Sequence, residues 1–263
     1  MPSREAFASP DNPSSPPAWA IPFGPLVPAT FVRRDNRFRV QVRLDGRSVA
    51  AHLPNSGRLT ELLVTGRRVW LAPADARRRE RRRTAYDLML VALADRLVSV
   101  DARLPTHLLD RAIRHGQVPP FKGYPIVRRE VRRGHSRLDL RLEGGADLPP
   151  CWIEVKSVTL VEEGVARFPD APTLRGQRHL EELIEIVRAG ERAAVVFVVQ
   201  RDDADRFAPH DEADPAFGAA LRRAAQAGVE VHAFRCHVSR EAIHLTAAIP
   251  VLLPHPFNPF PIR

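Results

Sequence analysis

The sequence predicts a mixed α/β protein in which a small all-β unit precedes a unit built around a mixed sheet. Short strand-like runs separated by turn residues fill residues 21–103. From residue 104 onward, helical and strand patterns follow the order β-β-α-β-α-β, which implies an antiparallel hairpin continued by parallel strands. The prolines of Val118-Pro119-Pro120 interrupt the chain near this change. We therefore assign residues 21–103 to a first domain, residues 104–263 to a second and residues 1–20 to a disordered tail.

The first unit consists of apolar runs with the periodicity of strands. Phe38, Val40, Val42 and Leu44 alternate with polar residues, and Asp45-Gly46 then supplies a hairpin turn. The further strand-like runs are residues 48–53, 67–71, 85–93 and 97–100. About five or six strands of this length predict a small barrel or sandwich, and an OB-like β-barrel fits that size.

The second unit contains the helices and strands of a mixed sheet. The expected helices are residues 104–114, residues 175–189 ending at Gly190, and residues 215–228 with Asp214 as the N-cap. The expected strands are residues 137–142, 151–160, 193–200 and 229–235. The third of these strands is almost continuously apolar, which is typical of a parallel strand covered on both faces.

The amino-acid composition excludes several classes of protein. The 263 residues include 40 Lys+Arg and 31 Asp+Glu, so the formal charge is +9. A hydrophobic fraction of 44% excludes disorder of the whole chain, and two cysteines are too few for a disulfide framework. Apolar runs such as residues 193–199 are far shorter than the roughly 18 residues of a membrane span. We expect a cytoplasmic protein without a signal peptide or membrane segment, and its basic charge suits nucleic acid.

One constellation has the chemistry of a metal-dependent hydrolytic site. Asp139 lies in SRLDLRL, and Glu154 and Lys156 lie in CWIEVKSVTL. Residues two apart in a strand face the same side, so Glu154 and Lys156 point together, and a hairpin would bring Asp139 beside them. Two carboxylates are hard oxygen ligands for Mg²⁺ or Mn²⁺, which activate water for attack on a phosphate. Lysine can act as a base whereas arginine stays charged, and Lys122 and Lys156 are the only lysines in the chain.

A simpler interpretation of these three residues is a solvent-facing set with one cross-strand ion pair, because so short a pattern recurs by chance. The order of elements favours a site. An acid and a lysine on the second strand of a hairpin, followed by a helix and a buried strand, is the arrangement of restriction-endonuclease-like PD-(D/E)XK phosphodiesterases. Glu130, in IVRREVRR, is a candidate further metal ligand or else a solvated charge among arginines.

A second polar cluster, RFPDAPTLRGQRH at residues 167–179, leads into the helix after the acidic strand. Arg175, Gln177 and His179 lie at the start of that helix, whose N-terminal amides favour anions such as phosphate. Asp170 precedes them in a proline-containing loop. We expect phosphate contact and support of the metal site here, with helix capping as the alternative.

Two arginine clusters predict contact with the nucleic-acid backbone. They are Arg77, Arg78, Arg79, Arg81, Arg82 and Arg83, and then Arg128, Arg129, Arg132 and Arg133. Phosphate contacts of this kind give salt-dependent affinity without sequence preference. Aromatic residues beside the first cluster are sparse, so stacking on single-stranded bases has little support there. Basic runs of this kind also occur in arginine-rich proteomes without a binding role.

Five segments, in this order, resemble the sugar fermentation stimulation protein A family. They are HLPNSGRLTELLVTGRRVWL, RTAYDLMLVALADRLVSVDARLP, SRLDLRL, CWIEVKSVTL and RFPDAPTLRGQRHLEEL. The resemblance implies an OB-fold joined to a PD-(D/E)XK-like domain, non-specific DNA binding and a proposed role in regulating sugar catabolism. It implies that the acids and the base are Asp139, Glu154 and Lys156. Further motif positions fall on Asn55, Gly57, Arg58, Arg167, Asp170, Arg175 and His179.

Three hypotheses follow from these observations. The first is a DNA-binding protein whose second domain is a Mg²⁺-dependent phosphodiesterase, in which Asp139 and Glu154 bind metal and Lys156 positions water. In this hypothesis the arginine clusters, with Arg58 and Arg175, hold the nucleic-acid backbone. The second is a non-catalytic, sequence-non-specific DNA-binding regulator of sugar catabolism that keeps the nuclease scaffold. The third is an RNA-processing factor, which shares the same electrostatics.

Overall fold

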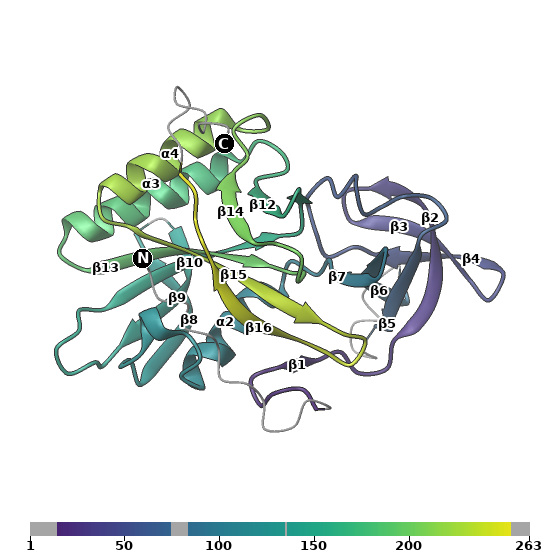
Figure 1. The fold of residues 1–263 in the computed structure, drawn as a ribbon, viewed down its shortest axis with the longest axis horizontal. Coiled ribbons are helices and arrows are strands. Elements are labelled where there is room, and N and C mark those ends of the chain that lie inside the picture. The colour runs from purple at the N-terminus through teal and green to yellow at the C-terminus, as the bar shows by residue number, and fades with distance from the viewer. Residues whose placement is uncertain (1–14, 75–83, 135, 254–263) are drawn as a thin grey trace.

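The structure is a computed structural model that describes residues 15–74, 84–134 and 136–253. Its first unit is a β-barrel, on the right in Figure 1. The strands are β2 (Val27–Asn36), β3 (Arg39–Leu44), β4 (Arg47–His52), β5 (Arg68–Pro73), β6 (Tyr86–Leu93) and β7 (Arg96–Ser99). They lie in the order β4-β3-β2-β5-β6-β7, and an additional pairing of β4 with β6 closes the barrel. The small OB-like barrel predicted from the apolar runs is thus confirmed.

The second unit is a mixed sheet of seven described strands. They are β1 (Ile21–Pro22), β8 (Ile126–Arg133), β9 (Ser136–Glu143), β10 (Cys151–Val158), β13 (Arg192–Val199), β15 (Glu230–Val238) and β16 (Ala242–Ile249). Their order is β1-β16-β15-β13-β10-β9-β8. β10 pairs in parallel with β13, and β13 with β15, whereas β8 with β9, β9 with β10 and β15 with β16 are antiparallel. The mixed sheet predicted from the order of elements is confirmed.

Strand β1 differs from the sequence-based assignment. The sequence places residue 21 at the start of the barrel, but Ile21 pairs with Ile243 of β16 at the edge of the large sheet (Figure 1). This pairing joins segments that are far apart in the chain, so no local pattern indicates it. The chain therefore contributes a strand to the large sheet before it enters the barrel.

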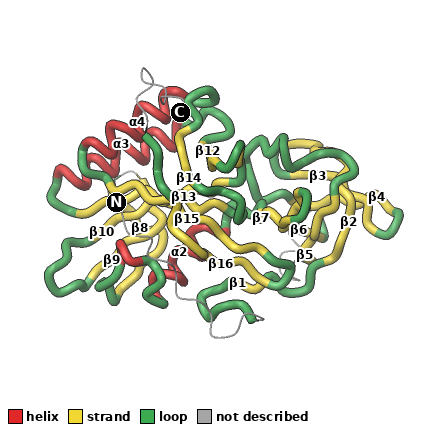
Figure 2. Tube along the Cα trace, in the orientation of Figure 1, coloured by secondary structure: helices red, strands yellow, loops and turns green. Residues whose placement is uncertain are grey.

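In the described part of the chain, three α-helices cover the large sheet (Figure 2). α3 (Leu174–Arg188) and α4 (Pro215–Gln226) pack on one face, and α2 (Leu104–Arg114) packs on the other. Asp214 caps α4 by accepting a hydrogen bond from the Phe217 amide at 3.0 Å. The 3₁₀ turn η1 (Pro119–Phe121) and a small sheet of β11 (Val161–Glu162), β12 (Val165–Phe168) and β14 (Arg206–Pro209) complete the fold. None of the described helices combines the length and the apolar character that crossing a membrane requires.

Strand β10 lies in the middle of the large sheet, and both of its faces are covered. Ile153 and Val155 belong to the apolar cluster on the α2 side, and Trp152 belongs to the cluster on the α3 side. Because side chains alternate along a strand, Glu154 and Lys156 share the α3 side with Trp152. They are only 4% and 9% exposed. Burying two charged side chains costs free energy unless they are paired, so this position requires partners for both.

The barrel packs against the large sheet through a common apolar cluster. Trp70 of the barrel lies in the same cluster as Leu108 of α2 and Ile243 of β16. Two buried hydrogen bonds add to this contact: Ser99 donates to the carbonyl of Gln200 through its amide at 3.1 Å and to Gln200 Oε1 through its hydroxyl at 3.0 Å. The two units therefore form one packed body, and the loops at their junction keep a fixed relation.

Candidate active site

The carboxylate of Asp139 lies where strands β9 and β10 separate. The pairing of the two strands ends at Leu140 and Ile153. Beyond that pair, the Val155 amide donates a hydrogen bond to Asp139 Oδ2 at 2.8 Å. The side chain takes the place of a backbone carbonyl as the acceptor for this buried amide, which fixes Asp139 against β10.

Glu154, Lys156 and His179 form a buried hydrogen-bonded cluster between β10 and α3. Lys156 Nζ donates to Glu154 Oε1 at 2.6 Å, and His179 Nδ1 binds the same oxygen. Lys156 Nζ also lies 3.5 Å from His179 Nδ1. Arg175, one turn earlier on α3, donates to His179 Nε2 at 3.4 Å, so the proton of the neutral ring resides on Nδ1 and is donated to Glu154. His179 is 6% exposed, which leaves the cluster little contact with bulk solvent.

Burial and neighbouring charges give the two carboxyl groups different acidities. Burial, followed by the nearby charge of Glu154, raises the pKa of Asp139 to about 6. Burial also opposes ionisation of Glu154, but the charge of Lys156 and the hydrogen bond from His179 outweigh it, so the pKa of Glu154 lies below its usual value. Glu154 is therefore ionised at neutral pH, whereas Asp139 titrates at a pH close to neutral. Such a difference in acidity between two neighbouring carboxyl groups is common at functional sites.

The donor set fits a small divalent cation. Glu154 Oε2 is buried and has no hydrogen-bond partner among the described residues, so an ion or solvent must satisfy it. Asp139 adds a carboxylate from the adjacent strand, and two carboxylates suit Mg²⁺, which retains several waters. Within residues 15–74, 84–134 and 136–253, no three His, Cys, Asp or Glu side chains form a ready-made metal site. The pair would therefore hold an ion together with solvent or phosphate oxygens.

A cleft of about 300 Å³ leads from the junction of barrel and sheet to Lys156. Its walls are residues 155–160 and 167–173 of the sheet unit, together with Arg37, residues 55–57 and Ala102. Asn55 braces the barrel wall, because its Nδ2 donates to the Val100 carbonyl at 3.0 Å and its Oδ1 accepts from the Gly57 amide at 2.8 Å. The predicted supporting residue Asn55 thus shapes the cleft from within the barrel.

Asp170 connects the two walls of the cleft. Its Oδ2 accepts hydrogen bonds from the Arg58 amide at 2.6 Å and the Leu59 amide at 3.4 Å. On the barrel side, Arg34 donates to the carbonyls of Gly57 and Arg58, each at 2.7 Å. Charged groups therefore hold both the amides and the carbonyls of this loop, and such bonds are stronger than those between neutral groups.

Replacing Gly57 with alanine should loosen this junction, because a Cβ at that position would lie 2.5 Å from Asp170 Oδ2. We expect a loss of about 1–3 kcal/mol in the free energy of unfolding, the cost of overpacking or of one lost buried hydrogen bond. Denaturant titration measures this change in the free energy of unfolding. Ser56→Ala, at the exposed neighbouring position, is the control and should change stability by less than about 0.5 kcal/mol. Equal stability of the two variants would show that the close approach is unimportant.

Glu130 does not join the acidic cluster, which corrects the expectation that it adds a metal ligand. Its carboxylate pairs with Arg137 at 3.1 Å and is 54% exposed. The φ of Glu130 is 54°, a left-handed conformation that interrupts the regular alternation of side chains along β8. Its charge acts on His107 of α2, on the face of the sheet away from Lys156.

The other predicted supporting residues separate into two groups. Arg167 lines the cleft and pairs with Glu162 at 2.9 Å. Gln177 instead donates to the carboxylate of Asp214 at 3.3 and 3.4 Å, so it belongs to the N-cap network of α4. For Gln177 the structure favours capping, which was the alternative to phosphate contact.

The first arginine cluster, which comprises Arg77, Arg78, Arg79, Arg81, Arg82 and Arg83, lies outside the described residues. The second cluster, Arg128, Arg129, Arg132 and Arg133, lies on β8 at the edge of the large sheet. Arg128 pairs with Glu143 at 3.0 Å, and Arg133 pairs with Glu191. Arg132 is exposed on the same strand. The edge strand thus presents a basic surface in which several charges are already partly neutralised.

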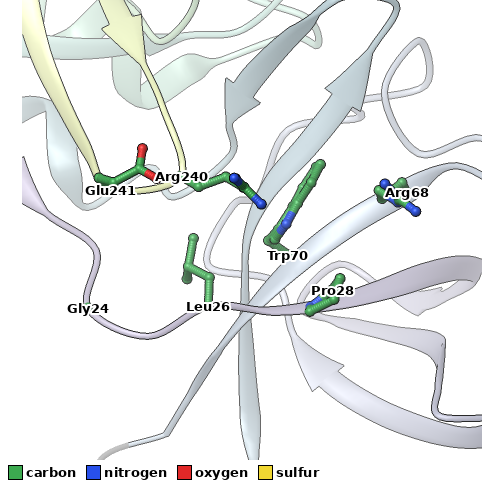
Figure 3. A pocket seen from close by; sticks show the side chains of 7 residues that line it. All are labelled: Gly24, Leu26, Pro28, Arg68, Trp70, Arg240 and Glu241. Atoms are coloured by element: carbon green, nitrogen blue, oxygen red, sulfur yellow. The ribbon is translucent and has the colours of Figure 1, made fainter. Parts of the chain in front are cut away.

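A larger hollow of about 430 Å³ lies elsewhere on the junction of barrel and sheet (Figure 3). Its described lining consists of Gly24, Leu26, Pro28, Arg68, Trp70, Arg240 and Glu241. Arg240, from the turn between β15 and β16, points toward the Trp70 ring. The hollow shares no residue with the acidic cluster, and Glu241 contributes the one carboxylate of this lining. We therefore assign the chemistry to the smaller cleft.

Sequence patterns do not reveal Arg34, Arg37 and Ala102, although the first positions the cleft loop and the other two line the cleft. Both arginines stand in the basic segment RRDNRFR, where nothing distinguishes them from other surface arginines. Ala102 carries no functional group. Only the packing of the barrel against the sheet brings these residues to the site.

The fold and the site together define a class of protein: a small OB-like barrel packed on a mixed sheet whose adjacent interior strands β9 and β10 carry an acidic pair and a lysine. Residues 32–100 match the family model described as the SfsA N-terminal OB domain. Residues 103–242 match the model of the sugar fermentation stimulation protein RE domain. The chain belongs to the sugar fermentation stimulation protein A family, which confirms the resemblance seen in the sequence.

Known relatives cover most of the chain. A sugar fermentation stimulation protein homolog of Moorella thermoacetica is 49% identical over 228 residues, which is 87% of this chain and 97% of that protein. A homolog of Symbiobacterium thermophilum is 50% identical over 237 residues, covering 86% and 94% respectively. The structure of Pyrococcus furiosus SfsA in complex with Ca²⁺ superposes with a TM-score of 0.81 at 33% identity, covering 88% of this chain and 98% of that one.

Proposed function

We propose that this chain is a DNA-binding protein whose sheet unit hydrolyses phosphodiester bonds with a divalent metal ion. One observation carries the proposal: the buried cluster of Glu154, Lys156 and His179 lies beside Asp139 and leaves Glu154 Oε2 without a partner among the described residues. Such an oxygen is costly to bury unless a cation or solvent satisfies it. If Glu154 and Lys156 formed a purely structural ion pair, the nearby carboxyl group of Asp139 would add nothing to it. Burial and the charge of Glu154 instead raise the pKa of Asp139.

Asp139 and Glu154 are the residues that would hold Mg²⁺ or Mn²⁺. The relative from Pyrococcus furiosus was solved in complex with Ca²⁺, which also prefers oxygen ligands. Such an ion supplies a Lewis acid that polarises a phosphate oxygen and favours ionisation of water.

The remaining roles belong to side chains of this chain. Lys156 Nζ, held by Glu154 Oε1 at 2.6 Å, would position the attacking water. The water oxygen bonds to phosphorus as the bond from phosphorus to the leaving sugar oxygen breaks, and the proton lost by water ends on that leaving oxygen. His179 holds Glu154 in place, and Arg175 holds His179 from the other side. Such supporting contacts keep a ligand oriented during reaction.

Electrostatics support a nucleic acid as the partner. The chain has a formal charge of +9, and Arg58 and Arg132 are exposed beside the cleft loop and on the edge strand. OB-like barrels commonly bind oligonucleotides. Contacts of arginine with the sugar-phosphate backbone carry no sequence information, so we propose binding without sequence preference.

Affinity for duplex DNA should fall steeply with salt, because each neutralised phosphate releases counterions. For about six contacts we expect a loss of about 10³-fold between 50 and 200 mM salt, measured by fluorescence anisotropy. Arg132→Ala should lower the slope of log affinity against log salt by about 1. A flat salt response of the wild-type protein would contradict phosphate contact.

Incubation with labelled DNA and RNA in Mg²⁺ or Mn²⁺ tests catalysis, with EDTA as the metal-free control. Cleavage that requires the metal supports the proposal. If no substrate is cut under either metal, the proposed hydrolysis is wrong.

The second candidate is a non-catalytic DNA-binding regulator of sugar catabolism that retains the nuclease scaffold. One observation favours it: among the described residues, no third acidic or imidazole ligand completes a metal site with the two carboxylates. DNA binding that is unaffected by Asp139→Asn and by metal, without cleavage, would support this candidate. For either function we propose a cytoplasmic location, since Cys151 and Cys236 are buried free thiols rather than a disulfide.

A further inference from the structure

Most of the acidic cluster lies below the surface of the protein. Glu154, Lys156 and His179 are buried, whereas Asp139 is partly exposed and is held against β10 by the Val155 amide. Among the three buried side chains of the cluster, Lys156 lines the cleft between barrel and sheet. The cleft therefore gives a phosphate a route to Lys156.

Duplex nucleic acid is poorly suited to such an entry. In a duplex each strand is stacked and paired, and bending it over a few base pairs costs several kcal/mol. Enzymes whose target atom lies inside the base stack act on single strands, or they first take a nucleotide out of the stack. A strand without a partner can turn its backbone into a recess at much lower cost.

The size of the cleft agrees with one nucleotide. Its volume of about 300 Å³ is at the lower end of the range of about 300–1,000 Å³ typical of small-ligand pockets. Two stacked base pairs would need a wider opening. The hydrogen bond of Asp170 Oδ2 to the Arg58 amide, at 2.6 Å across the junction, opposes widening of the cleft.

The lining supplies cations for a phosphate. Arg37 belongs to the barrel wall and Arg167, which pairs with Glu162 at 2.9 Å, belongs to the sheet wall. The Ser157 hydroxyl adds a polar group, whereas the Phe168 ring packs against Phe197 and Phe217 in the core. A positively charged groove that follows the backbone is typical of single-strand binding.

Two exposed apolar residues are the chain neighbours of lining residues. Phe38 is 47% exposed, directly follows Arg37 and stacks on the His52 ring at a centroid distance of 6.5 Å, and Leu174 is 75% exposed and directly follows Thr173. Unpaired bases expose apolar faces that pack on such side chains, whereas paired bases hide theirs. The exposed ring of Phe38 thus offers an aromatic face for stacking on the barrel that forms one wall of the cleft.

We propose that the cleft binds one nucleotide of an unpaired strand, so that the substrate is a single-stranded nucleic acid or the single-stranded part of a longer molecule. The proposal rests on the proposed function in using the same cluster, but it concerns the form of the substrate.

Matched oligonucleotides test it in Mg²⁺ or Mn²⁺. One labelled strand is offered alone, annealed to its full complement, and annealed so that one end remains unpaired, in DNA and in RNA versions. We expect cleavage within unpaired segments to exceed that of the blunt duplex by more than about 100-fold, the cost of misplacing a reacting group by about 1 Å. Equal cleavage of the blunt duplex would overturn the proposal while leaving the nuclease function intact.

Binding provides a second measurement that does not depend on cleavage. In Ca²⁺, Ala102→Trp should lower the affinity for a short labelled single strand by about tenfold or more, because the indole would occupy the cleft. Ala102 is exposed, and its backbone N–H donates a hydrogen bond to the Pro54 carbonyl. Substitution of the side chain leaves this hydrogen bond in place, so the fold should survive. Ala102→Ser is the matched control and should bind as the wild type does.

Arg37→Ala should weaken single-strand binding in the same assay, whereas Arg47→Ala, at the start of β4 and outside the cleft lining, should not. If Ala102→Trp and Arg37→Ala both bind the single strand normally, the cleft is not the binding site. If no nucleic acid is cut but these variants lose binding, the nuclease function fails and the single-strand site stands.

Discussion

Lys156→Ala should lower metal-dependent cleavage by about 10²–10⁴-fold, the usual contribution of a positioned proton-transfer or water-orienting group. Binding of nucleic acid should persist, because the exposed arginines proposed to contact phosphates are unchanged. Lys156→Arg should fail to restore activity, since a guanidinium stays charged and is too large for this buried position. Cleavage rates at saturating substrate, with affinity measured separately, distinguish these effects.

The control is Lys122→Ala, which removes the only other lysine of the chain from an exposed position. Because removal of Lys156 leaves Glu154 without its ion-pair partner, Lys156→Gln provides a variant that still donates a hydrogen bond. Circular dichroism and thermal melting report whether both variants fold. A folded Lys156→Gln variant that cuts at the wild-type rate would exclude a chemical role for this lysine.

Asp139→Asn should stabilise the metal-free protein at neutral pH by about 2–3 kcal/mol. The pKa of Asp139 is raised from 3.8 to about 6 in the folded state, and each pKa unit corresponds to about 1.4 kcal/mol. Above pH 6 the folded protein must hold a buried carboxylate that the unfolded chain ionises freely. An asparagine removes this cost and can still accept the hydrogen bond of the Val155 amide.

The stability of Asp139→Asn relative to the wild type should increase with pH. Below about pH 4 the carboxyl group is protonated in both states, so the variant and the wild type should differ little from this cause. As pH rises from 4 to 6, the unfolded chain binds fewer protons than the folded one, and the wild type loses stability relative to the variant. Urea unfolding in EDTA measures the difference at each pH. Asp95→Asn, at an exposed carboxylate beside Arg96, is the control, and a pH-independent difference for Asp139→Asn would contradict burial as the cause.

Local patterns predicted the elements that carry the site. Alternation along residues 151–158 places Glu154 and Lys156 on one side of a strand, and Asp214 with Pro215 marks the start of α4. The hairpin of β9 and β10 follows from two strand-like runs joined by a turn region rich in Gly and Pro. These features depend on residues close together in the chain, where periodicity and capping act directly.

Contacts between distant segments could not be predicted in this way. His179 reaches Glu154 only because α3 packs over β10, and Asp170 reaches Arg58 only because the barrel packs beside the sheet. Glu130 has a left-handed backbone conformation that no strand pattern indicates, and its exposed pairing with Arg137 agrees with the alternative of a solvated charge rather than a metal ligand. The sequence therefore identified the donors of the candidate site, whereas the cleft that leads to them required the tertiary structure.

The apolar cluster shared by Trp70, Leu108 and Ile243 has an evolutionary consequence. A barrel that is joined to the neighbouring domain by a linker alone can be transferred between proteins as an independent domain. Here excision would expose a tryptophan and part of the interior of the large sheet, and it would remove one wall of the cleft. A substitution on the barrel side of this apolar interface must therefore be matched by one on the sheet side. We expect the barrel and the sheet unit to diverge together rather than by independent recombination.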